Sequence, residues 1–576
     1  MTRNYKEEYQ RWLDSPALSE SEWEELNSIA NDEKEIESRF FAPLEFGTAG
    51  LRGTMKLGLH QMNVHIIRHA TQAFANVIKA EGEEAMKKGI AICFDCRNNS
   101  ELFAHEAACV MAANGIHVRI FDALRPTPEL SFAVRCYGTT AGLNITASHN
   151  PKEYNGYKVY WSDGAQLPPQ HAEAIAEQMS KIDIFDDFVS CDFDEAVAQG
   201  NIELIGTETD EAYLECVLGQ AINKPLVAKV APELKIVYTP FHGAGYKLVP
   251  EALRRLGITQ LYPVPEQMVI DGNFPTVESP NPENPEGFYL AVDLAKKVGS
   301  DLIIGTDPDS DRIGVMVRSG GDYISITGNQ LGVLLLDYVI NARKAAGTLP
   351  ENAGAVKSIV TTEMAKVVAE TNGVHFEDTF TGFKFMAERI AQWEKAGSYK
   401  YIFAYEESYG YMMGDYVRDK DAVTASMMVA EMAAYYYDKG MNLSQAMESL
   451  YAKYGRYAEK TLNLVMPGLD GIVKMKNLMA ELRSNPPKQI AGVEVFKLRD
   501  YSDGSIKVPE LGVMGQTPIK GSNVLYFELA DGTSFIVRPS GTEPKVKVYI
   551  LCKGADKAEC DAKIAKYSEY AEGLRK

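Results

Sequence analysis

A short pattern that occurs three times along the chain constrains the fold more than any other feature. Each copy begins with an apolar, β-branched run, continues through a polar or glycine-containing loop, and ends in an amphipathic segment that stops near a glycine. The copies span residues 88–115, 234–257 and 355–373. This order is typical of a strand, a loop and a helix that ends at glycine. Because the copies lie roughly 120–150 residues apart, we expect three related α/β domains, each with its own sheet.

The remaining sequence extends this organisation to four domains. The chain has 576 residues, 45% of them hydrophobic, and at about 150 residues per domain this length corresponds to about four domains. After residue 450, strand-like runs (524–529, 534–538 and 545–552) lie beside helical segments (471–483 and 557–573), which indicates a smaller α+β domain. The first 40 residues are charged and helix-prone, so we expect them to wrap the first domain.

The charge balance and the cysteine content exclude several classes of protein. Lys and Arg total 59 and Asp and Glu total 79, so the net charge is −20, and we expect no nucleic-acid partner and no membrane partner. The N-terminus carries no apolar signal sequence, and the longest apolar stretch, near residues 331–340, is too short to span a bilayer, so we expect a soluble, cytoplasmic protein. The lone pair Cys93 and Cys96 fits buried thiols at a strand end better than a zinc or redox site.

The first candidate for chemistry is Ser148, in the sequence Thr146-Ala-Ser-His-Asn-Pro151. A serine between a β-prone run and a proline is expected on a tight, exposed loop. Hydrolase chemistry is disfavoured, because His149 is adjacent in the chain rather than on a separate element, and no G-x-S-x-G elbow is present. A serine that carries a phosphoryl group fits better, although an ordinary Ser/Asn/Pro turn explains this motif equally well when it is taken alone.

The second candidate is the acidic loop Gly305-Thr-Asp-Pro-Asp-Ser-Asp-Arg312, which directly follows an apolar strand-like run. On an extended loop, Asp307, Asp309 and Asp311 point the same way, because side chains alternate along the chain. Three converging carboxylates repel one another unless a hard divalent cation binds between them. The pattern therefore favours a metal site over a solvated acidic turn.

The third candidate is Arg538-Pro-Ser-Gly-Thr-Glu-Pro-Lys545. Its backbone amides, two hydroxyls, one guanidinium and one ammonium are the groups that bind a phosphate dianion. It is not a Walker A loop, because G-x-x-x-x-G-K-[ST] is absent. A polar hairpin turn is the alternative, and the number of anion-binding groups favours a phosphate-binding loop.

Two further loops are weaker candidates. In Phe46-Gly-Thr-Ala-Gly-Leu-Arg-Gly53, the glycines let the backbone approach an anion, and the guanidinium of Arg52 can bind it. In Tyr405-Glu-Glu-Ser-Tyr-Gly410, Glu406 and Ser408 are placed to bind neighbouring sugar hydroxyls. A capping turn explains the second loop equally well.

These motifs, in this order, resemble the α-D-phosphohexomutase superfamily, the phosphoglucomutase/phosphomannomutase family, and most closely its phosphoglucomutase branch with phosphopentomutase-like members. The resemblance runs from Phe46 to Lys547, nearly the whole chain, and the combination of TASHNP, the triple-Asp loop and RPSGTEPK is highly specific. It also includes FDCR at 94–97, TPFHGAG at 239–245, DGNFP at 271–275, PNPE at 280–283 and TGFK at 381–384.

The resemblance implies three related mixed α/β domains and a smaller C-terminal α+β domain around one central cleft. The expected domains are residues 1–208 with the N-terminal extension and the phosphoserine loop, 209–322 with the metal loop, 323–452 with the sugar-binding loop, and 453–576 with the phosphate-binding loop.

The resemblance also implies roles for individual residues. Ser148 would carry the phosphoryl group and, with Asp307, Asp309 and Asp311, hold one Mg²⁺ per chain. Arg52 and Lys158 would lie near the migrating group, and Lys158, His149 and Lys384 are three open candidates for the general base. The expected substrate-binding residues are Thr48, Arg312, Glu406, Ser408, Arg538, Ser540, Gly541, Thr542 and Lys545. The arginines and lysines of this set would make a locally positive site in an acidic protein.

The implied activity is that of a phosphoglucomutase, which interconverts α-D-glucose 1-phosphate and glucose 6-phosphate through a phosphoserine enzyme, with glucose 1,6-bisphosphate as intermediate and activator. Phosphomannomutase, phosphopentomutase or dual activity stays open, because Glu406 and Ser408 do not read the configuration at the second carbon of the sugar. A metal-dependent phosphatase and a non-catalytic phosphosugar-binding protein are the competing classes; Ser148 and the three aspartates are intact, which argues against the second.

Two departures from the family pattern limit which residue roles can be carried over to this chain. Gly410 stands where some members have a histidine, and Pro308 and Ser310 replace two glycines in the acidic loop. The departures leave all three aspartates in place. The expected oligomeric state is open, monomer or dimer.

Overall fold

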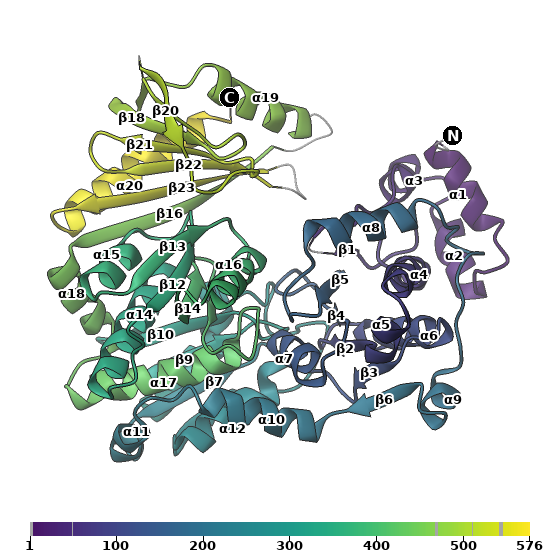
Figure 1. The fold of residues 1–576 in the computed structure, drawn as a ribbon, viewed down its shortest axis with the longest axis horizontal. Helices are drawn as coiled ribbons and strands as arrows, with labels where there is room; N and C mark the ends of the chain where they lie inside the picture. The colour runs from purple at the N-terminus through teal and green to yellow at the C-terminus, as the bar shows by residue number, and fades with distance from the viewer. Residues whose placement is uncertain (1–3, 49, 467–470, 510, 541–544, 576) are drawn as a thin grey trace. The chain divides into compact units, whose positions relative to one another are not determined.

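The computed structural model describes residues 4–48, 50–466, 471–509, 511–540 and 545–575 (Figure 1). These residues form two compact units, one of residues 1–326 and 409–442 and the other of residues 327–408 and 443–576. The chain therefore passes from one unit to the other after residues 326, 408 and 442.

The first sheet of the first unit has the strand order β1-β5-β4-β2-β3-β6. Strands β2, β3, β4 and β6 run parallel, whereas β5 pairs antiparallel with both β4 and β1. The strands are β1 (Leu51–Thr54), β2 (Ile90–Phe94), β3 (Val118–Phe121), β4 (Ala141–Ile145), β5 (Tyr154–Trp161) and β6 (Ile202–Ile205). The helices of this domain are α4 (Val64–Ala80), α5 (Glu83–Lys88), α6 (Ser100–Ala113), α7 (Thr127–Tyr137), α8 (Pro169–Met179) and α9 (Phe193–Ala198).

The position of β2 in the middle of the sheet explains why its sequence is apolar throughout. Ile90 and Ile92 belong to the core that α4 and α6 share, whereas Ala91 and Cys93 belong to the core that α7 covers. Parallel strands that are covered by helices on both faces have nearly continuous apolar runs. Both faces of the sheet are therefore buried at β2, and the serine loop lies at the end of the neighbouring strand β4.

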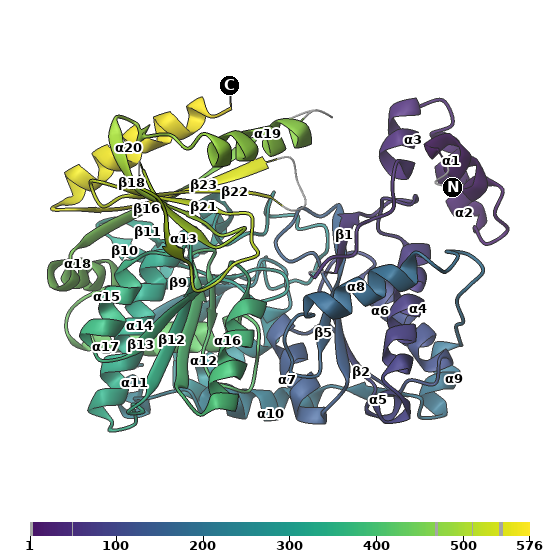
Figure 2. The ribbon, with the colours of Figure 1, turned by 45° about the horizontal axis from the view of Figure 1, so that its top comes forward.

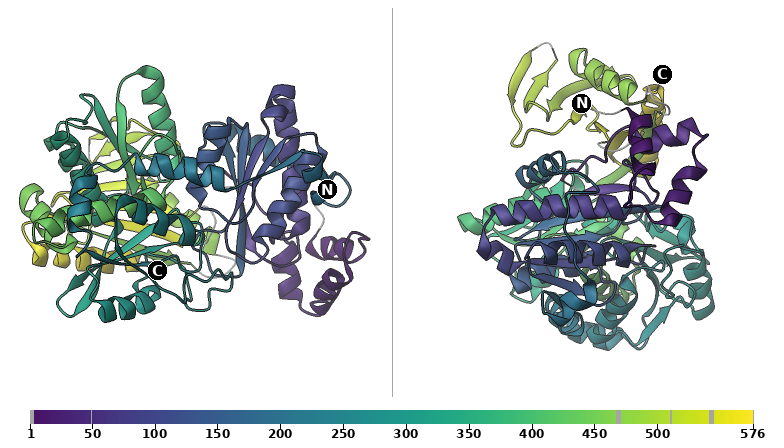
Figure 3. Two further views of the ribbon diagram at one scale, coloured as in Figure 1. Left: turned by 90° about the horizontal axis from the view of Figure 1, so that it is seen from below. Right: turned by 90° about the vertical axis from the view of Figure 1, so that its right-hand side faces the viewer.

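The N-terminal helices α1 (Tyr5–Leu13), α2 (Glu20–Ser28) and α3 (Glu33–Phe40) pack on this first domain (Figure 3). Trp12 of α1 is fully buried, and its ring lies edge-on to the rings of His65 at 5.6 Å and Phe185 at 5.1 Å. His65 belongs to α4, so the N-terminal segment contributes to the core of this domain.

The second sheet of the first unit has the order β11-β10-β9-β7-β8. Its strands are β7 (Lys235–Thr239), β8 (Gln260–Pro263), β9 (Leu302–Thr306), β10 (Ile313–Ser319) and β11 (Asp322–Ile326). Its helices are α10 (Thr207–Leu218), α11 (Lys224–Val230), α12 (Gly245–Leu256), the 3₁₀ helix η1 (Pro285–Phe288) and α13 (Tyr289–Val298). A later segment, with β15 (Gly410–Met412) and α17 (Ala422–Asp438), belongs to the same unit, and α17 packs on α10, α11 and α12.

In the second unit, a parallel sheet runs in the order β13-β12-β14. Helices α15 and α16 lie on opposite sides of these strands (Figure 2). The elements are β12 (Ala353–Ser358), β13 (His375–Thr379), β14 (Lys400–Glu406), α14 (Gly328–Ala345), α15 (Met364–Thr371), α16 (Phe383–Ala396) and α18 (Leu443–Tyr454). Helix α14 approaches β14 closely at Gly332, where a Cβ atom would lie 2.0 Å from the ring of Tyr405.

The last domain is built on an antiparallel sheet in the order β16-β23-β22-β21-β18-β19-β20, with β17 paired to β18. The strands are β16 (Arg456–Val465), β17 (Gln489–Ile490), β18 (Val493–Asp500), β19 (Ser505–Val508), β20 (Gly512–Gln516), β21 (Leu525–Leu529), β22 (Ser534–Pro539) and β23 (Lys545–Gly554), with helices α19 (Gly471–Ser484) and α20 (Lys557–Gly573). An apolar cluster that includes Ile359, Phe380, Tyr526 and Tyr549 joins this sheet to the preceding α/β domain.

The predicted fold class is confirmed: the described residues form three α/β sheets of related construction and a C-terminal α+β domain. The boundary expected after residue 322 falls inside β11, which pairs with β10, so the second sheet extends to Ile326. No helix in the described part of the chain is long and apolar enough to cross a membrane. Cys93 and Cys96 are free thiols, and Cys93 is buried in β2.

Two buried histidines of α4 predict that the folded protein becomes less stable at acid pH. Burial lowers the pKa of His69 and also that of His65, where the carboxylate of Glu22 partly opposes the effect. An unfolded histidine binds a proton near pH ~6.5, so the free energy of unfolding should fall as the pH is lowered through that value toward the folded pKa. We expect the urea midpoint, followed by tryptophan fluorescence, to be lower at pH ~5.5 than at pH ~7.5.

The variant His69→Gln keeps a donor for the carbonyl oxygen of Ile182, which the His69 ring contacts at 3.1 Å. It should lose less stability over this pH interval than the wild type. Equal losses in the wild type and His69→Gln would contradict the assignment.

Candidate active site

The serine loop connects the end of β4 to the start of β5, and Arg97 determines its shape. The guanidinium of Arg97 donates hydrogen bonds to four carbonyl oxygens of this loop, those of Pro151 at 2.8 Å, Tyr154 at 3.0 Å, Ser148 at 2.5 Å and Asn150 at 2.5 Å. Arg97 is 3% exposed, and the rigid fork of an arginine can hold several acceptors in fixed positions. Arg97 therefore acts as a template for the loop, a role that its motif in the sequence did not reveal.

Asp95 holds both Arg97 and the start of the serine loop in place. Its carboxylate pairs with Arg97 Nε at 3.2 Å and accepts a hydrogen bond from Thr146 Oγ1 at 2.6 Å. Thr146 Oγ1 in turn accepts a hydrogen bond from the backbone N–H of Ser148 at 2.8 Å. A chain of buried hydrogen bonds thus leads from the end of β2 to the backbone of Ser148.

Ser148 is only 4% exposed, so the expectation of an exposed position is wrong. Its backbone is left-handed, with φ of +54°. Such a conformation costs a non-glycine residue about 1–3 kcal/mol and persists only where surrounding contacts fix it. The Oγ of Ser148 donates a hydrogen bond to Asp307 Oδ2 at 3.0 Å and lies 3.1 Å from His149 Nδ1. The serine loop and the acidic loop, which the sequence singled out separately, therefore meet at this hydroxyl.

The acidic loop between β9 and β10 is a tight turn, and the expectation of an extended loop is wrong. The N–H of Ser310 donates to the carbonyl oxygen of Asp307 at 2.9 Å, and Ser310 has φ of +52°. This turn, rather than the alternation of an extended chain, brings Asp307, Asp309 and Asp311 together. One oxygen of each lies within 4.8 Å of the others, and all three residues are at most 1% exposed.

The TPFHGAG segment after β7 packs directly on this turn. A Cβ atom at Gly243 would lie 2.5 Å from the Cα of Pro308, and the N–H of Ala244 donates to the carbonyl oxygen of Pro308 at 2.8 Å. Only glycine allows an approach this close. The glycine thus has a packing role that supports the acidic loop.

Two lysines balance part of this negative charge. Lys158 Nζ on β5 lies 2.7 Å from Asp309 Oδ2 and 3.5 Å from Asp311 Oδ2. Lys420 Nζ lies 3.0 Å from Asp311 Oδ2 and 3.3 Å from Asp419 Oδ1. Lys420 was not among the predicted site residues; its signal in the sequence is the charged run 418–421, on the segment that returns to the first unit.

The electrostatics of the three carboxylates fit a divalent cation. Burial, together with the charges of Asp309 and Asp311, raises the pKa of Asp307 well above its usual range. In addition, Asp309 Oδ1 and Asp311 Oδ1 are buried and have no hydrogen-bond partner among the described residues. Oxygen ligands of this kind are what Mg²⁺ prefers, so the donor set fits the metal that the sequence predicts.

Two other expected residues lie around this cluster. Arg52 on β1 donates from Nη1 to Asn150 Oδ1 of the serine loop at 3.0 Å, and Arg312 Nη1 pairs with Glu283 Oε1 at 2.6 Å. Thr48 lies in the turn before β1, where Gly50 has φ of +77° and a Cβ atom would lie 1.7 Å from the carbonyl oxygen of Tyr157. The glycine at position 50 is thus required for packing on β5.

The three candidate bases differ in their pKa shifts. Burial lowers the pKa of His149 well below its usual value, and the charges of Arg312 and Arg52 lower it further, so its ring is neutral near pH ~7. Burial alone would lower the pKa of Lys158, but the carboxylates of Asp309 and Asp311 outweigh it and raise the pKa. Burial lowers the pKa of Lys384 on α16.

The second unit brings together the other expected residues. Glu406 ends β14 and accepts a hydrogen bond from the N–H of Gly382, and Ser408 follows in the next turn. Arg538 is the last residue but one of β22, and its Nη1 lies 3.4 Å from the hydroxyl of Tyr549. Burial raises the pKa of Tyr549, the carboxylates of Glu407 and Glu406 also raise it, and Arg538 opposes them. The candidate sugar-binding and phosphate-binding loops therefore lie near each other within this unit.

The candidate phosphate-binding loop is closed at its base. The N–H of Ser540 donates to the carbonyl oxygen of Lys545 at 2.8 Å, which joins the end of β22 to the start of β23. The expected residues Gly541 and Thr542 lie outside the described residues.

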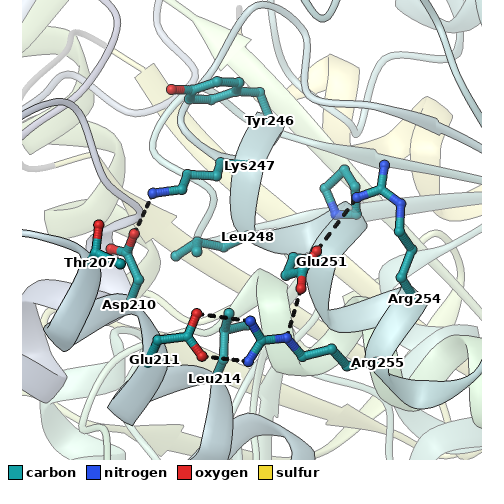
Figure 4. Close-up of a pocket in the computed structure, with 11 residues that line it drawn as sticks. Thr207, Asp210, Glu211, Leu214, Tyr246, Lys247, Leu248, Glu251, Arg254 and Arg255 are labelled. Atoms are coloured by element: carbon teal, nitrogen blue, oxygen red, sulfur yellow. Dashed lines mark hydrogen bonds and ion pairs between the residues drawn. The ribbon is translucent and has the colours of Figure 1, made fainter.

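A cavity of about 380 Å³ lies elsewhere in the first unit, between α10 and α12 (Figure 4). Its cations are paired with carboxylates of the same cavity: Lys247 with Asp210, Arg254 with Glu251, and Arg255 with both Glu211 and Glu251. These pairs already neutralise the charges that an anionic substrate needs. The candidate active site is therefore the cluster around Ser148.

The combination of a buried serine, converging carboxylates and surrounding cations on repeated α/β sheets defines a class of multidomain enzymes that handle phosphate groups. All four domains of the phosphoglucomutase/phosphomannomutase family match the chain: α/β/α domain I over residues 43–184, α/β/α domain II over 211–320, α/β/α domain III over 327–454, and the C-terminal domain over 478–566. The chain belongs to this family. Its members are intramolecular phosphotransferases, and the chain is an enzyme of that class.

Curated relatives agree with this assignment, and a solved structure shares the fold. A phosphoglucomutase of Staphylococcus aureus strain MRSA252 is 36% identical over 531 residues, which cover 91% of this chain and 92% of the relative. A phosphoglucomutase of Staphylococcus saprophyticus is 35% identical over 520 residues, 90% of this chain and 92% of the relative. The solved structure of parafusin, a phosphoglucomutase from Paramecium, shares the fold with a TM-score of 0.67 at 18% identity, covering 92% of this chain and 94% of that chain.

The template role of Arg97 can be tested with Arg97→Lys. Lysine keeps the charge but replaces the fork with a single nitrogen, which cannot hold four carbonyl oxygens at once. Because a displacement of about 1 Å can cost about 100-fold in rate, we expect kcat for mutase turnover to fall by about 100-fold.

The matched control is Arg119→Lys, an arginine of the same sheet on β3 that pairs with Glu203. It should keep wild-type turnover. If Arg97→Lys retained kcat within about threefold of the wild type, the loop would not depend on the fork.

Proposed function

We propose that this chain is a phosphoglucomutase in which Ser148 carries the phosphoryl group between the two positions of glucose phosphate. The observation that carries the proposal is the hydroxyl of Ser148, which lies 3.0 Å from a buried aspartate of a three-carboxylate cluster. The relatives named phosphoglucomutase support glucose as the sugar.

The reaction consists of two phosphoryl transfers in opposite directions. First, the phosphoryl group leaves Ser148 Oγ and bonds to the free hydroxyl oxygen of the sugar monophosphate, whose proton passes to a base. The resulting glucose 1,6-bisphosphate then turns over, and Ser148 Oγ takes the other phosphoryl group while that sugar oxygen recovers a proton. Each transfer breaks one P–O bond and forms one, so the enzyme ends as it began.

Charge neutralisation and alignment are the main catalytic requirements of phosphoryl transfer. Asp307, Asp309 and Asp311, with the phosphorylated Ser148, would hold Mg²⁺, which supplies positive charge next to the phosphoryl group. Arg52 and Arg312 add guanidinium groups for its equatorial oxygens. We assign Lys158 to this group of cations rather than to the role of base, because its carboxylate partners keep it protonated.

The second unit carries the other residues that the proposal assigns to substrate binding. Glu406 and Ser408 present a carboxylate and a hydroxyl to the sugar hydroxyls. The segment Arg538–Lys545, with Ser540, Gly541 and Thr542, would bind the phosphate that is not being transferred. His149 and Lys384 stay the candidates for the general base.

The proposal also covers the number of metal ions, the intermediate and the choice of sugar. One Mg²⁺ binds per chain, glucose 1,6-bisphosphate is both intermediate and activator, and phosphomannomutase or phosphopentomutase activity is the alternative specificity. Magnesium dependence is typical of this family. The cytoplasmic location and the domain boundaries at residues 208 and 452 also stay predictions.

Removal of the carrier tests the proposal directly. Ser148→Ala should lower mutase turnover by roughly 1,000-fold or more, because no other group in the proposal accepts the phosphoryl. Turnover is measured as conversion of glucose 1-phosphate to glucose 6-phosphate with trace bisphosphate present. Ser180→Ala, at the exposed end of α8, is the control and should keep full activity. Near-wild-type turnover in Ser148→Ala would overturn the carrier role.

Loss of one carboxylate charge tests the metal site. Asp309→Asn should raise the Mg²⁺ concentration for half-maximal rate by about 10-fold or more, because ligand charge sets the affinity of such sites. Asp301→Asn, at the opposite end of β9, removes a carboxylate that pairs with Arg318 and should leave the Mg²⁺ requirement unchanged. Full activity of the wild type in excess EDTA would show that no metal is needed.

A further inference from the structure

Thr127 is the first residue of α7, and it contacts the acidic loop through both backbone and side chain. Its N–H donates to the carbonyl oxygen of Asp309 at 2.8 Å, and its Oγ1 donates to Asp309 Oδ2 at 2.9 Å. Both residues are 0% exposed. Thr127 belongs to the first α/β domain and Asp309 to the second, so this pair joins the two domains at the proposed metal site.

The hydrogen bonds determine which oxygen of Asp309 is available. Oδ2 accepts from Thr127 Oγ1 and, at 2.7 Å, from Lys158 Nζ. Oδ1 is buried and has no hydrogen-bond partner among the described residues. A carboxylate that is held through one oxygen by two donors on different elements cannot rotate freely, so it presents the other oxygen in a fixed direction.

Asn144 on β4 sets the direction of the Thr127 hydroxyl. Its Nδ2 donates to Thr127 Oγ1 at 2.7 Å, so the single hydroxyl proton is left for Asp309 Oδ2. Asn144 lies two residues before Thr146, whose hydroxyl supports the backbone of Ser148. The row Asn144, Thr127 and Asp309 therefore connects the strand that leads to the serine loop with the acidic loop.

We propose that Thr127 is a positioning residue of the metal site, which fixes the carboxylate of Asp309 so that Oδ1 faces the cation and keeps the acidic loop in register with the serine loop. This inference rests on the metal site of the proposed function. Thr127 does not touch the cation or the sugar, and it acts through Asp309. Mutation of a side chain that hydrogen bonds a metal ligand in this way commonly lowers the affinity of the site for its metal.

The test is the affinity of the purified protein for Mg²⁺, measured by titration calorimetry, in three variants with equal phosphoserine content by intact mass. Thr127→Val keeps the shape of the side chain and removes the hydroxyl, whereas Thr127→Ser keeps the hydroxyl. Thr209→Val is the matched control, because Thr209 is a buried threonine at the start of α10 whose Oγ1 lies 2.8 Å from the hydroxyl of Tyr137 and which is not part of the cluster.

We expect Thr127→Val to bind Mg²⁺ about 10-fold to 100-fold more weakly than the wild type, and Thr127→Ser and Thr209→Val to bind within about threefold of it. Wild-type affinity in Thr127→Val overturns the inference and leaves the proposed function intact. An equal loss in Thr209→Val also overturns it, because the effect would then come from general loosening of the domain contact. If the wild type itself binds no Mg²⁺, the metal site of the proposed function fails and the inference fails with it.

Discussion

The burial of three carboxylates next to one hydroxyl is the constraint on which the rest of the site depends. Oxygens of Asp307, Asp309 and Asp311 lie within 4.8 Å of one another, and all three residues are buried. Like charges at such distances raise the pKa of at least one member unless cations lie close by. Lys158 and Lys420 provide two positive charges, and the two unsatisfied carboxylate oxygens mark the place where a divalent ion would provide the remainder. A phosphoryl group on Ser148 adds further negative charge, so its binding and that of the cation should support each other.

The precision of the site comes from contacts between segments that lie far apart in the sequence. Arg97 holds the serine loop through four carbonyl oxygens, and Gly243 lets the β7–α12 loop press against the acidic turn. Thr127 links the first α/β domain to Asp309, and Lys420 arrives on the segment that re-enters the first unit after residue 408. Groups fixed in this way need little reorganisation during phosphoryl transfer, and preorganisation of this kind is a major source of catalysis.

Much of this arrangement was predictable from local sequence. Apolar runs followed by glycine-ended helices predicted the three sheets, because strand and helix periodicity is a local property. Ser148 and the three aspartates were predicted because their residue types match phosphate and metal chemistry in short loops. Arg97, Lys420 and Thr127 were not assigned their roles, because those roles depend on which distant segment each side chain meets. The shape of the acidic loop was wrong for a related reason, since the left-handed Ser310 is stabilised by its tertiary surroundings rather than by the alternation of an extended chain.

In the proposed reaction, the phosphoryl group found on the product is the one that the enzyme held beforehand. The most direct measurement is a single turnover in which unlabelled phosphoenzyme meets glucose 1-phosphate whose phosphoryl oxygens are heavy isotopes, with mass analysis of both sugar and protein. The account predicts that the glucose 6-phosphate of this first turnover carries the unlabelled phosphoryl group and that the heavy one resides on Ser148. If the heavy phosphoryl group stayed on the sugar and never reached the protein, the account would be contradicted.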